Sequence, residues 1–199
     1  MQLKTIATQA QDGIKVISLT DLRGGNYTMV YLIVLLAVLA RFVPHIPNFS
    51  PVYGALLFGG AYMRKRDSIW FPLVLLGASD FVATNVIYHM SIGWGELFQI
   101  AAFAAMAMMG WLLRPRVTLR RFSLACVAGP TAFYLISNLG VWLGWHTYPP
   151  TGAGLVQCYV AGLPFYGYSL SSAFLFAGVL FGPYEFYRGR DVHTTCAQA

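Results

Sequence analysis

The residues best suited to chemistry in this sequence are ionisable and amide side chains that lie within long apolar stretches. Asp80 lies in the second half of one such stretch, and Thr84 follows one helical turn later on the same face. A charged side chain costs about 2.5–3.5 kcal/mol at the centre of a membrane-spanning helix, so it is a functional candidate by default. The structural alternative is that Asp80 accepts hydrogen bonds from Asn138, Thr84 or backbone amides and fixes helix packing.

A larger set of polar and aromatic residues could share one pocket. Asn138, Trp142 and Trp145 follow one another at spacings that align them along a single helical face. Small-molecule sites usually combine aromatic or apolar walls with a few polar groups that orient the ligand. We therefore predict a substrate-binding site formed by His45, Asn48, Asp80, Asn85, Glu96, Asn138, Trp142, Trp145, His146 and Tyr148.

Enzymatic and metal chemistry find less support in the residue spacing. The histidines and carboxylates could in principle gather a metal ion, but none has a recognisable spacing such as HExxH. No serine or cysteine lies in a nucleophile motif, and Cys126, Cys158 and Cys196 show no CxxC or paired spacing. We therefore predict a protein that is not an enzyme, with no catalytic residues, no metal site and no cofactor.

The composition indicates which solvent surrounds these residues. Of 199 residues, 57% are hydrophobic and only 10% are charged, whereas a soluble domain carries about 25% charged residues. Lipid is therefore the expected solvent for most of the chain. The net charge of +6 does not indicate nucleic-acid binding, because the Lys and Arg residues lie at the ends of apolar runs and not on one soluble face.

The apolar runs predict an all-α, polytopic membrane protein with a bundle of six transmembrane helices. Crossing the hydrocarbon takes about 20 mainly apolar residues. The expected spans are residues 27–43, 50–63, 69–88, 93–113, 122–145 and 159–183, the second being short and framed by prolines. We predict a cytoplasmic extension over 1–26, a transmembrane domain over 27–187 and a cytoplasmic tail over 188–199. The Pro- and Gly-rich connector from His146 to Tyr159 has the composition of a lid.

The distribution of basic residues predicts the orientation of the spans. With six alternating spans, one side holds twelve of the 13 Lys and Arg residues, and the other side holds Arg41 alone. Cytoplasmic loops retain positive charge. We therefore predict a multi-pass protein of the cell (inner) membrane with both termini in the cytoplasm. In this frame the candidate site residues converge on the outer half of the bundle.

Several motifs resemble a known family. The segments RFVPHIPNFSPVYGALLFGGAY, PLVLLGASD and SNLGVWL, with the Tyr148–Pro149 pair, are similar to uncharacterised bacterial membrane proteins of S-component-like type over roughly residues 30–183. S-components are the substrate-binding subunits of energy-coupling-factor vitamin transporters. The resemblance implies a high-affinity binder of a vitamin or similar micronutrient. It also implies a transmembrane coupling subunit and ATPases as partners, since this sequence has no Walker motif.

Two functional hypotheses follow from these observations. The first is a substrate-binding or uptake protein of S-component type, with a vitamin-like small molecule held in a pocket open to the outer side. The second is a small accessory transmembrane subunit of a larger membrane complex, whose polar stripe faces a partner helix, pigment or lipid. Under both hypotheses the protein lies in the lipid bilayer and does not bind nucleic acid.

Overall fold

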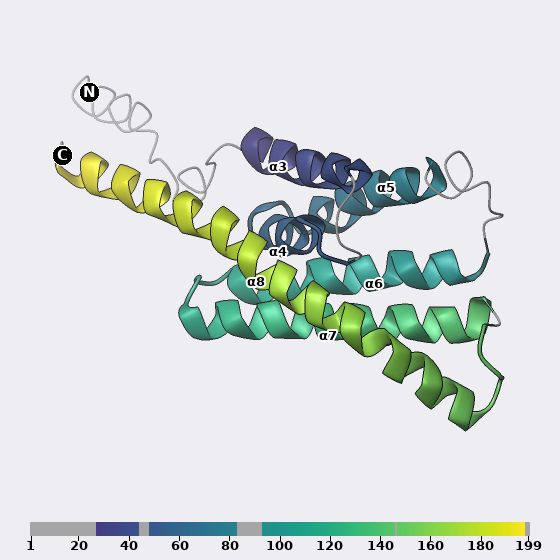
Figure 1. Ribbon diagram of the computed structural model, residues 1–199. Coiled ribbons are helices and arrows are strands. Elements are labelled where there is room, and N and C mark those ends of the chain that lie inside the picture. Colours follow the sequence, from purple (N-terminus) through teal and green to yellow (C-terminus); the bar gives the residue numbers. More distant parts are fainter. Residues whose placement is uncertain (1–26, 44–47, 83–92, 146, 198–199) are drawn as a thin grey trace, which may run out of the picture.

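The fold consists entirely of helices over the residues that the structure describes. The computed structural model describes residues 27–43, 48–82, 93–145 and 147–197, with side-chain detail from Thr28 to Tyr187. In chain order (Figure 1) the elements are α3 (Tyr27–Leu39), η1 (Ala40–Phe42), α4 (Val52–Tyr62), α5 (Asp67–Val82), α6 (Gly95–Met109), η3 (Gly110–Leu113), α7 (Leu119–Gly144) and α8 (Gly152–Ala197). The prediction of an all-α protein is confirmed for these residues.

Helix α4 forms the centre of the bundle, although it is short. Residues 52–61 are all buried, and α4 contacts each of the other five α-helices that the structure describes. Small residues permit this close packing. A Cβ added to Gly60 would lie 2.2 Å from the carbonyl oxygen of Ala107, and one added to Gly54 would lie 2.5 Å from the backbone nitrogen of Ala177. The Gly- and Ala-rich segment is therefore a packing core.

The helices differ in their ability to cross a bilayer. Three helical segments are long and apolar enough to span a membrane, namely Gly95–Leu113, Leu119–Gly144 and Gly152–Tyr187. The apolar segments Thr28–Phe42 and Val52–Tyr62 are shorter. At 1.5 Å per residue the 11-residue α4 is about 16 Å long, roughly half the hydrocarbon thickness. The second apolar segment is thus short, as predicted, and other helices surround it.

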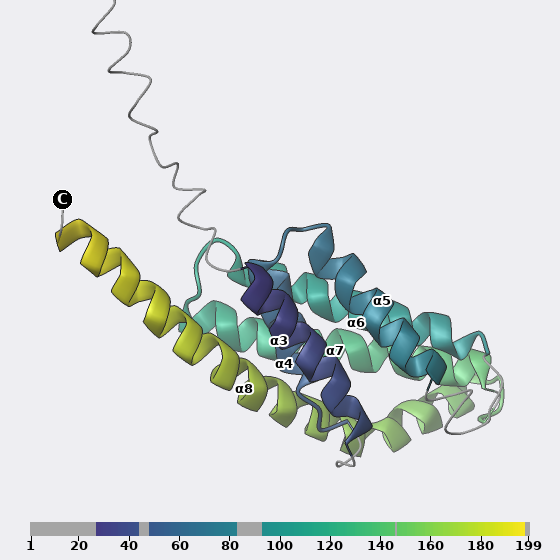
Figure 2. The same ribbon diagram turned by 90° about the horizontal axis from the view of Figure 1, so that it is seen from above.

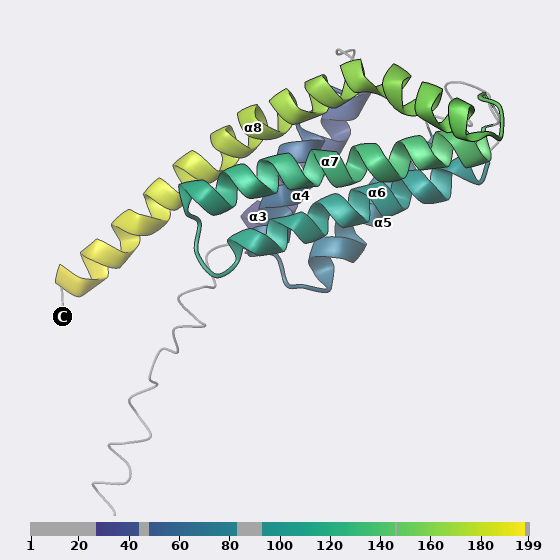
Figure 3. The ribbon, with the colours of Figure 1, turned by 90° about the horizontal axis from the view of Figure 1, so that it is seen from below.

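Helix α8 begins earlier and extends further than the predicted span. It starts at Gly152, not near Tyr159, and it runs for 46 residues. The start is specified locally, because Pro149 and Pro150 precede Thr151, whose side chain accepts a hydrogen bond from the Gly154 amide at 3.1 Å. The predicted lid from His146 to Tyr159 is therefore wrong for residues 152–159, which belong to α8. Figures 2 and 3 show the last turns of α8 projecting beyond the other helices.

The bundle has two chemically different ends. At one end, α3 leads to α4, α5 to α6 and α7 to α8; we call this the mouth end. At the other end, the turn 63–66 and the connection 114–118 carry the clustered basic residues; we call this the basic end. The side chain of Arg114 joins these two connections by donating to the Met63 carbonyl at 2.9 Å.

Candidate functional site

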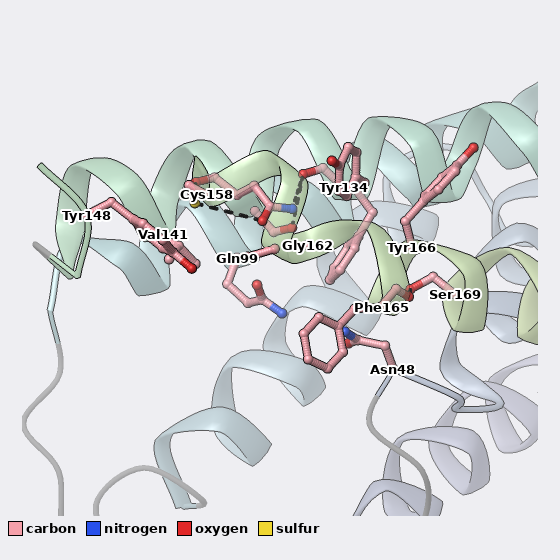
Figure 4. A pocket seen from close by; sticks show the side chains of 14 residues that line it. Asn48, Gln99, Tyr134, Val141, Tyr148, Cys158, Gly162, Phe165, Tyr166 and Ser169 are labelled. Atoms are coloured by element: carbon pink, nitrogen blue, oxygen red, sulfur yellow. Dashed lines mark hydrogen bonds between the residues drawn. The ribbon is translucent and has the colours of Figure 1, made fainter. Parts of the chain in front are cut away.

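A cavity of about 270 Å³ lies toward the mouth end, between α7, α8 and the polar turn that precedes α4. Figure 4 shows side chains from several elements extending into the same space, among them Asn48 from the turn, Gln99 from α6 and Phe165 from α8. The lining consists of Asn48, Gln99, Phe133, Tyr134, Ser137, Asn138, Val141, Tyr148, Cys158, Ala161, Gly162, Phe165, Tyr166 and Ser169.

Asn138 is held in place where α7 and α8 meet. Its Nδ2 donates to the Tyr134 carbonyl at 2.8 Å, and the Cys158 thiol donates to its backbone carbonyl at 3.3 Å. Gly162 leaves room for the amide, because a Cβ there would lie 2.5 Å from Asn138 Oδ1. The orientation of the Asn138 side chain therefore depends on the small residue facing it from α8.

Tyrosine side chains fix the spacing of the same two helices. The Tyr134 hydroxyl donates to the Tyr159 carbonyl at 2.5 Å, and the Tyr159 hydroxyl donates to the Leu135 carbonyl at 2.7 Å. The hydroxyls of Tyr166 and Thr131 lie 3.0 Å apart, and the Tyr134 and Tyr166 ring centroids are 5.1 Å apart. Because Tyr134 and Tyr166 also line the cavity, one of its walls is aromatic.

The turn before α4 is tied to the bundle on both sides of Asn48. The Tyr53 hydroxyl donates to Asn48 Oδ1 at 3.2 Å. The Ser50 amide donates to Ser172 Oγ at 3.1 Å, and that hydroxyl donates to the Ser50 carbonyl at 2.5 Å. Asn48 itself has φ 60°, in the left-handed region that asparagine tolerates better than most residues. The sequence thus positions a side-chain amide at the cavity through a specific backbone conformation.

The described side chains around the cavity are aromatic, aliphatic, or polar without a charge. Among the described residues, the lining has amide, hydroxyl and thiol groups and aromatic rings, and it contains no Lys, Arg, His, Asp or Glu. No cluster of three or more His, Cys, Asp or Glu side chains that could hold a metal ion occurs within the described part of the chain. Such a lining can stack against a planar ligand and hydrogen-bond to its polar edge.

A separate charged cluster lies between η1, α5 and α6. Arg41 Nη2 is 2.7 Å from Asp80 Oδ1, Arg41 Nη1 donates to Ser79 Oγ at 3.1 Å, and the guanidinium lies 5.5 Å from the Phe103 ring centroid. Glu96 is close enough to interact electrostatically with Asp80 and Arg41. The described partner of Asp80 is Arg41 and not Asn138, whose side chain lines the cavity and donates to the Tyr134 carbonyl. The other predicted partner, Thr84, lies outside the described residues.

The structure divides the predicted site residues into groups. Asn48, Asn138 and Tyr148 line the cavity, whereas Asp80 and Glu96 belong to the charged cluster. The two tryptophans are not among the lining residues. Trp142 Nε1 donates to the Pro149 carbonyl at 3.0 Å, and half-exposed Trp145 packs on Gly95. The remaining predicted residues, His45, Asn85 and His146, lie outside the described residues.

Sequence reasoning missed most of the cavity lining. Gln99 is three residues after Glu96, and Tyr134 is four residues before Asn138, so helical spacing from those candidates could have identified both. Phe133 and Phe165 carried no such signal, because aromatic residues that face lipid and those that face a cavity have the same hydropathy.

Comparison with known proteins gives a family without an assigned activity. A family model described as a family of unknown function (DUF6580) matches residues 23–195, and the chain belongs to this family. No curated protein and no solved structure matches the chain. The match covers all six described α-helices almost to the end of α8.

Proposed function

We propose that this family member is an integral membrane substrate-binding or uptake protein of S-component type, which holds a small, uncharged, planar molecule in the cavity between α7, α8 and the Asn48 turn. The observation that carries the proposal is the lining itself, which combines aromatic rings with side-chain amides and hydroxyls. Lipid-facing surfaces have no need of such convergent polar groups. Three of the residues expected from the sequence, Asn48, Asn138 and Tyr148, contribute to it.

The size and polarity of the cavity limit the ligand. Its volume of about 270 Å³ is near the lower end of small-molecule sites, which span about 300–1,000 Å³. A charged ligand would lose hydration there without meeting a side chain of opposite charge among the described lining residues, which is costly at membrane depth. The amides of Asn48, Gln99 and Asn138 would hydrogen-bond the ligand, and the ring of Tyr148 would stack on it.

The proposed direction of uptake follows from the charge distribution. The basic end is the cytoplasmic end under the positive-inside rule, so the cavity would open toward the outer side. Both termini would then be cytoplasmic, in the inner membrane. A vitamin-like micronutrient fits this arrangement. Energy for release would come from a transmembrane coupling subunit and its ATPases.

A thermal-shift screen of the detergent-purified protein tests the proposal. The compounds are uncharged vitamins and precursors, each paired with a charged analogue. Ligand at a hundredfold excess over its dissociation constant stabilises the native state by about 2.7 kcal/mol, so a true ligand raises the unfolding midpoint clearly. An absence of any shift, together with a large protein copurifying in equal amount, would contradict the proposal and favour an accessory subunit.

A further inference from the structure

The basic end of the bundle concentrates positive charge on one exposed face. Lys65 and Arg66 lie in the turn after α4, Arg116 lies in the connection before α7, and Arg120 and Arg121 lie in the first turn of α7; all five side chains are exposed. We call these five residues the basic face. Among residues with described side chains, the carboxylates at this end are Asp67 and Glu185. Each accepts a hydrogen bond from a tyrosine, Asp67 from Tyr31 and Glu185 from Tyr62.

Contacts between the two connections hold the basic face together. Arg114 donates to the Met63 carbonyl at 2.9 Å. Trp111 Nε1 donates to Ser68 Oγ at 3.0 Å. The Trp111 ring has the Lys65 ammonium 5.9 Å and the Arg114 guanidinium 5.8 Å from its centroid. Because these contacts join the turn after α4 to the segment before α7, the exposed cations of both lie on the same side of the molecule.

The start of α7 adds a second reason to expect an anion. Arg120 and Arg121 lie in the first turn of a 26-residue helix that has no acidic residue in that turn. Cations are unfavourable beside the positive end of a helix dipole, whereas an anion there is favoured by the dipole. The Arg121 amide itself donates to Thr118 Oγ1 at 3.4 Å. A bound phosphate would therefore relieve the repulsion between these arginines and the helix terminus.

The apolar surroundings indicate where that anion comes from. Leu119, adjacent to Arg120, is 82% exposed, and Trp70, near Arg66, is 63% exposed. Large apolar side chains beside cations are typical of the boundary between headgroups and acyl chains, where tryptophan is enriched. We propose that the basic face binds the phosphate of anionic phospholipid headgroups in the surrounding leaflet. This inference does not depend on the ligand of the cavity.

Lipid binding to the full chain tests the proposal. Native mass spectrometry counts the phosphatidylglycerol and phosphatidylcholine molecules retained by the wild type and by the double variant Arg120→Gln/Arg121→Gln. Both positions are exposed, so the variant should fold like the wild type. We expect the wild type to prefer phosphatidylglycerol and the variant to bind it about 25-fold more weakly, from about 1 kcal/mol per removed cation and 1.4 kcal/mol per tenfold. Lys65→Gln/Arg66→Gln, in the other connection, should weaken binding in the same direction.

Arg188→Gln/Arg190→Gln is the matched control, because it removes the same charge from the distal part of α8. It should retain the preference for phosphatidylglycerol. Equal weakening in this control, or an unchanged preference in both basic-face variants, would overturn the proposal. Inorganic phosphate is a separate arm: if it binds the wild type as tightly as the lipid does, free phosphate and not the membrane is the ligand.

Discussion

At the residue scale, Asp80 shows how an acidic group can be kept within an apolar bundle. Arg41 supplies the opposite charge at 2.7 Å, and Ser79 shares the same guanidinium. The lone basic residue of the mouth end thus has a structural partner. Ionisable groups within a bundle pair with one another because lipid offers them no hydrogen bonds. Here the pairing uses Asp80 Oδ1, whereas Oδ2 is buried without a hydrogen-bond partner among the described residues.

Neutralising Asp80 should therefore reduce stability more than it affects binding in the cavity. Asp80→Asn leaves Arg41 largely without its counter-charge. Loss of one partner from a buried pair costs about 3–5 kcal/mol, and we expect about 2–3 kcal/mol because the two side chains remain 26% and 15% exposed. The unfolding midpoint in detergent measures the loss.

The double variant Arg41→Gln/Asp80→Asn is the control for this interpretation. It removes both charges, so it should be more stable than the sum of the two single changes predicts. If the change in unfolding midpoint of the double variant equalled the sum of the changes for Arg41→Gln and Asp80→Asn, the two residues would not act as a pair.

At the element scale, the short central helix α4 depends on close approach to its neighbours. Gly60 meets the backbone of Ala107 and Gly110, and backbone cannot move aside as a flexible side chain can. The hydropathy of residues 50–63 predicted a short apolar segment here, but not that every other helix would pack against it, because hydropathy does not distinguish a buried helix from a lipid-facing one.

A methyl group at Gly60 should consequently push α4 and η3 apart. Gly60→Ala places a Cβ 2.2 Å from the Ala107 carbonyl oxygen, and overpacking of this kind costs about 1–3 kcal/mol or more. We expect a lower unfolding midpoint and a lower yield of folded protein. Gly178→Ala, on α8 with nothing within 4 Å of its Cβ, is the matched control and should be at least as stable as the wild type. Equal stability of the two variants would contradict the central role of α4.

At the scale of the whole molecule, the sequence predicted the helical class and the division into apolar segments, because both depend on composition and period. The predicted site included Asn48, Asn138 and Tyr148, which line the cavity, but also Asp80 and Glu96, which belong to the charged cluster. Position along the helices alone cannot separate these residues, because side chains at the same depth in the membrane can belong to different clusters. The start of α8 was missed because the glycines and prolines of residues 149–154 are typical of a loop, whereas Thr151 caps a helix there.

The two ends of the molecule should face opposite sides of the membrane. In a background with Cys196→Ser, the exposed positions Thr147→Cys and Arg66→Cys report the mouth end and the basic end. A membrane-impermeant thiol reagent should label Thr147→Cys in intact cells, and Arg66→Cys only after permeabilisation, because positive charge is retained inside. Cys126 is buried and Cys158 is buried beside the cavity, so the Cys196→Ser parent without an introduced cysteine measures the background labelling. The reverse labelling pattern would place the cavity on the cytoplasmic side.

The most direct test of the central claim is the dissociation constant of the compound that gives the largest thermal shift, measured for the wild type and three variants. Gln99→Ala removes a lining amide, and Gly162→Ala places a Cβ 2.5 Å from Asn138 Oδ1. Gly167→Ala, on the same helix with open space around it, is the control. Loss of one hydrogen bond is equivalent to about 0.5–1.5 kcal/mol, so Gln99→Ala and Gly162→Ala should bind about 3- to 10-fold more weakly while Gly167→Ala binds normally. Unchanged dissociation constants in all three variants would show that the ligand binds elsewhere and contradict the account.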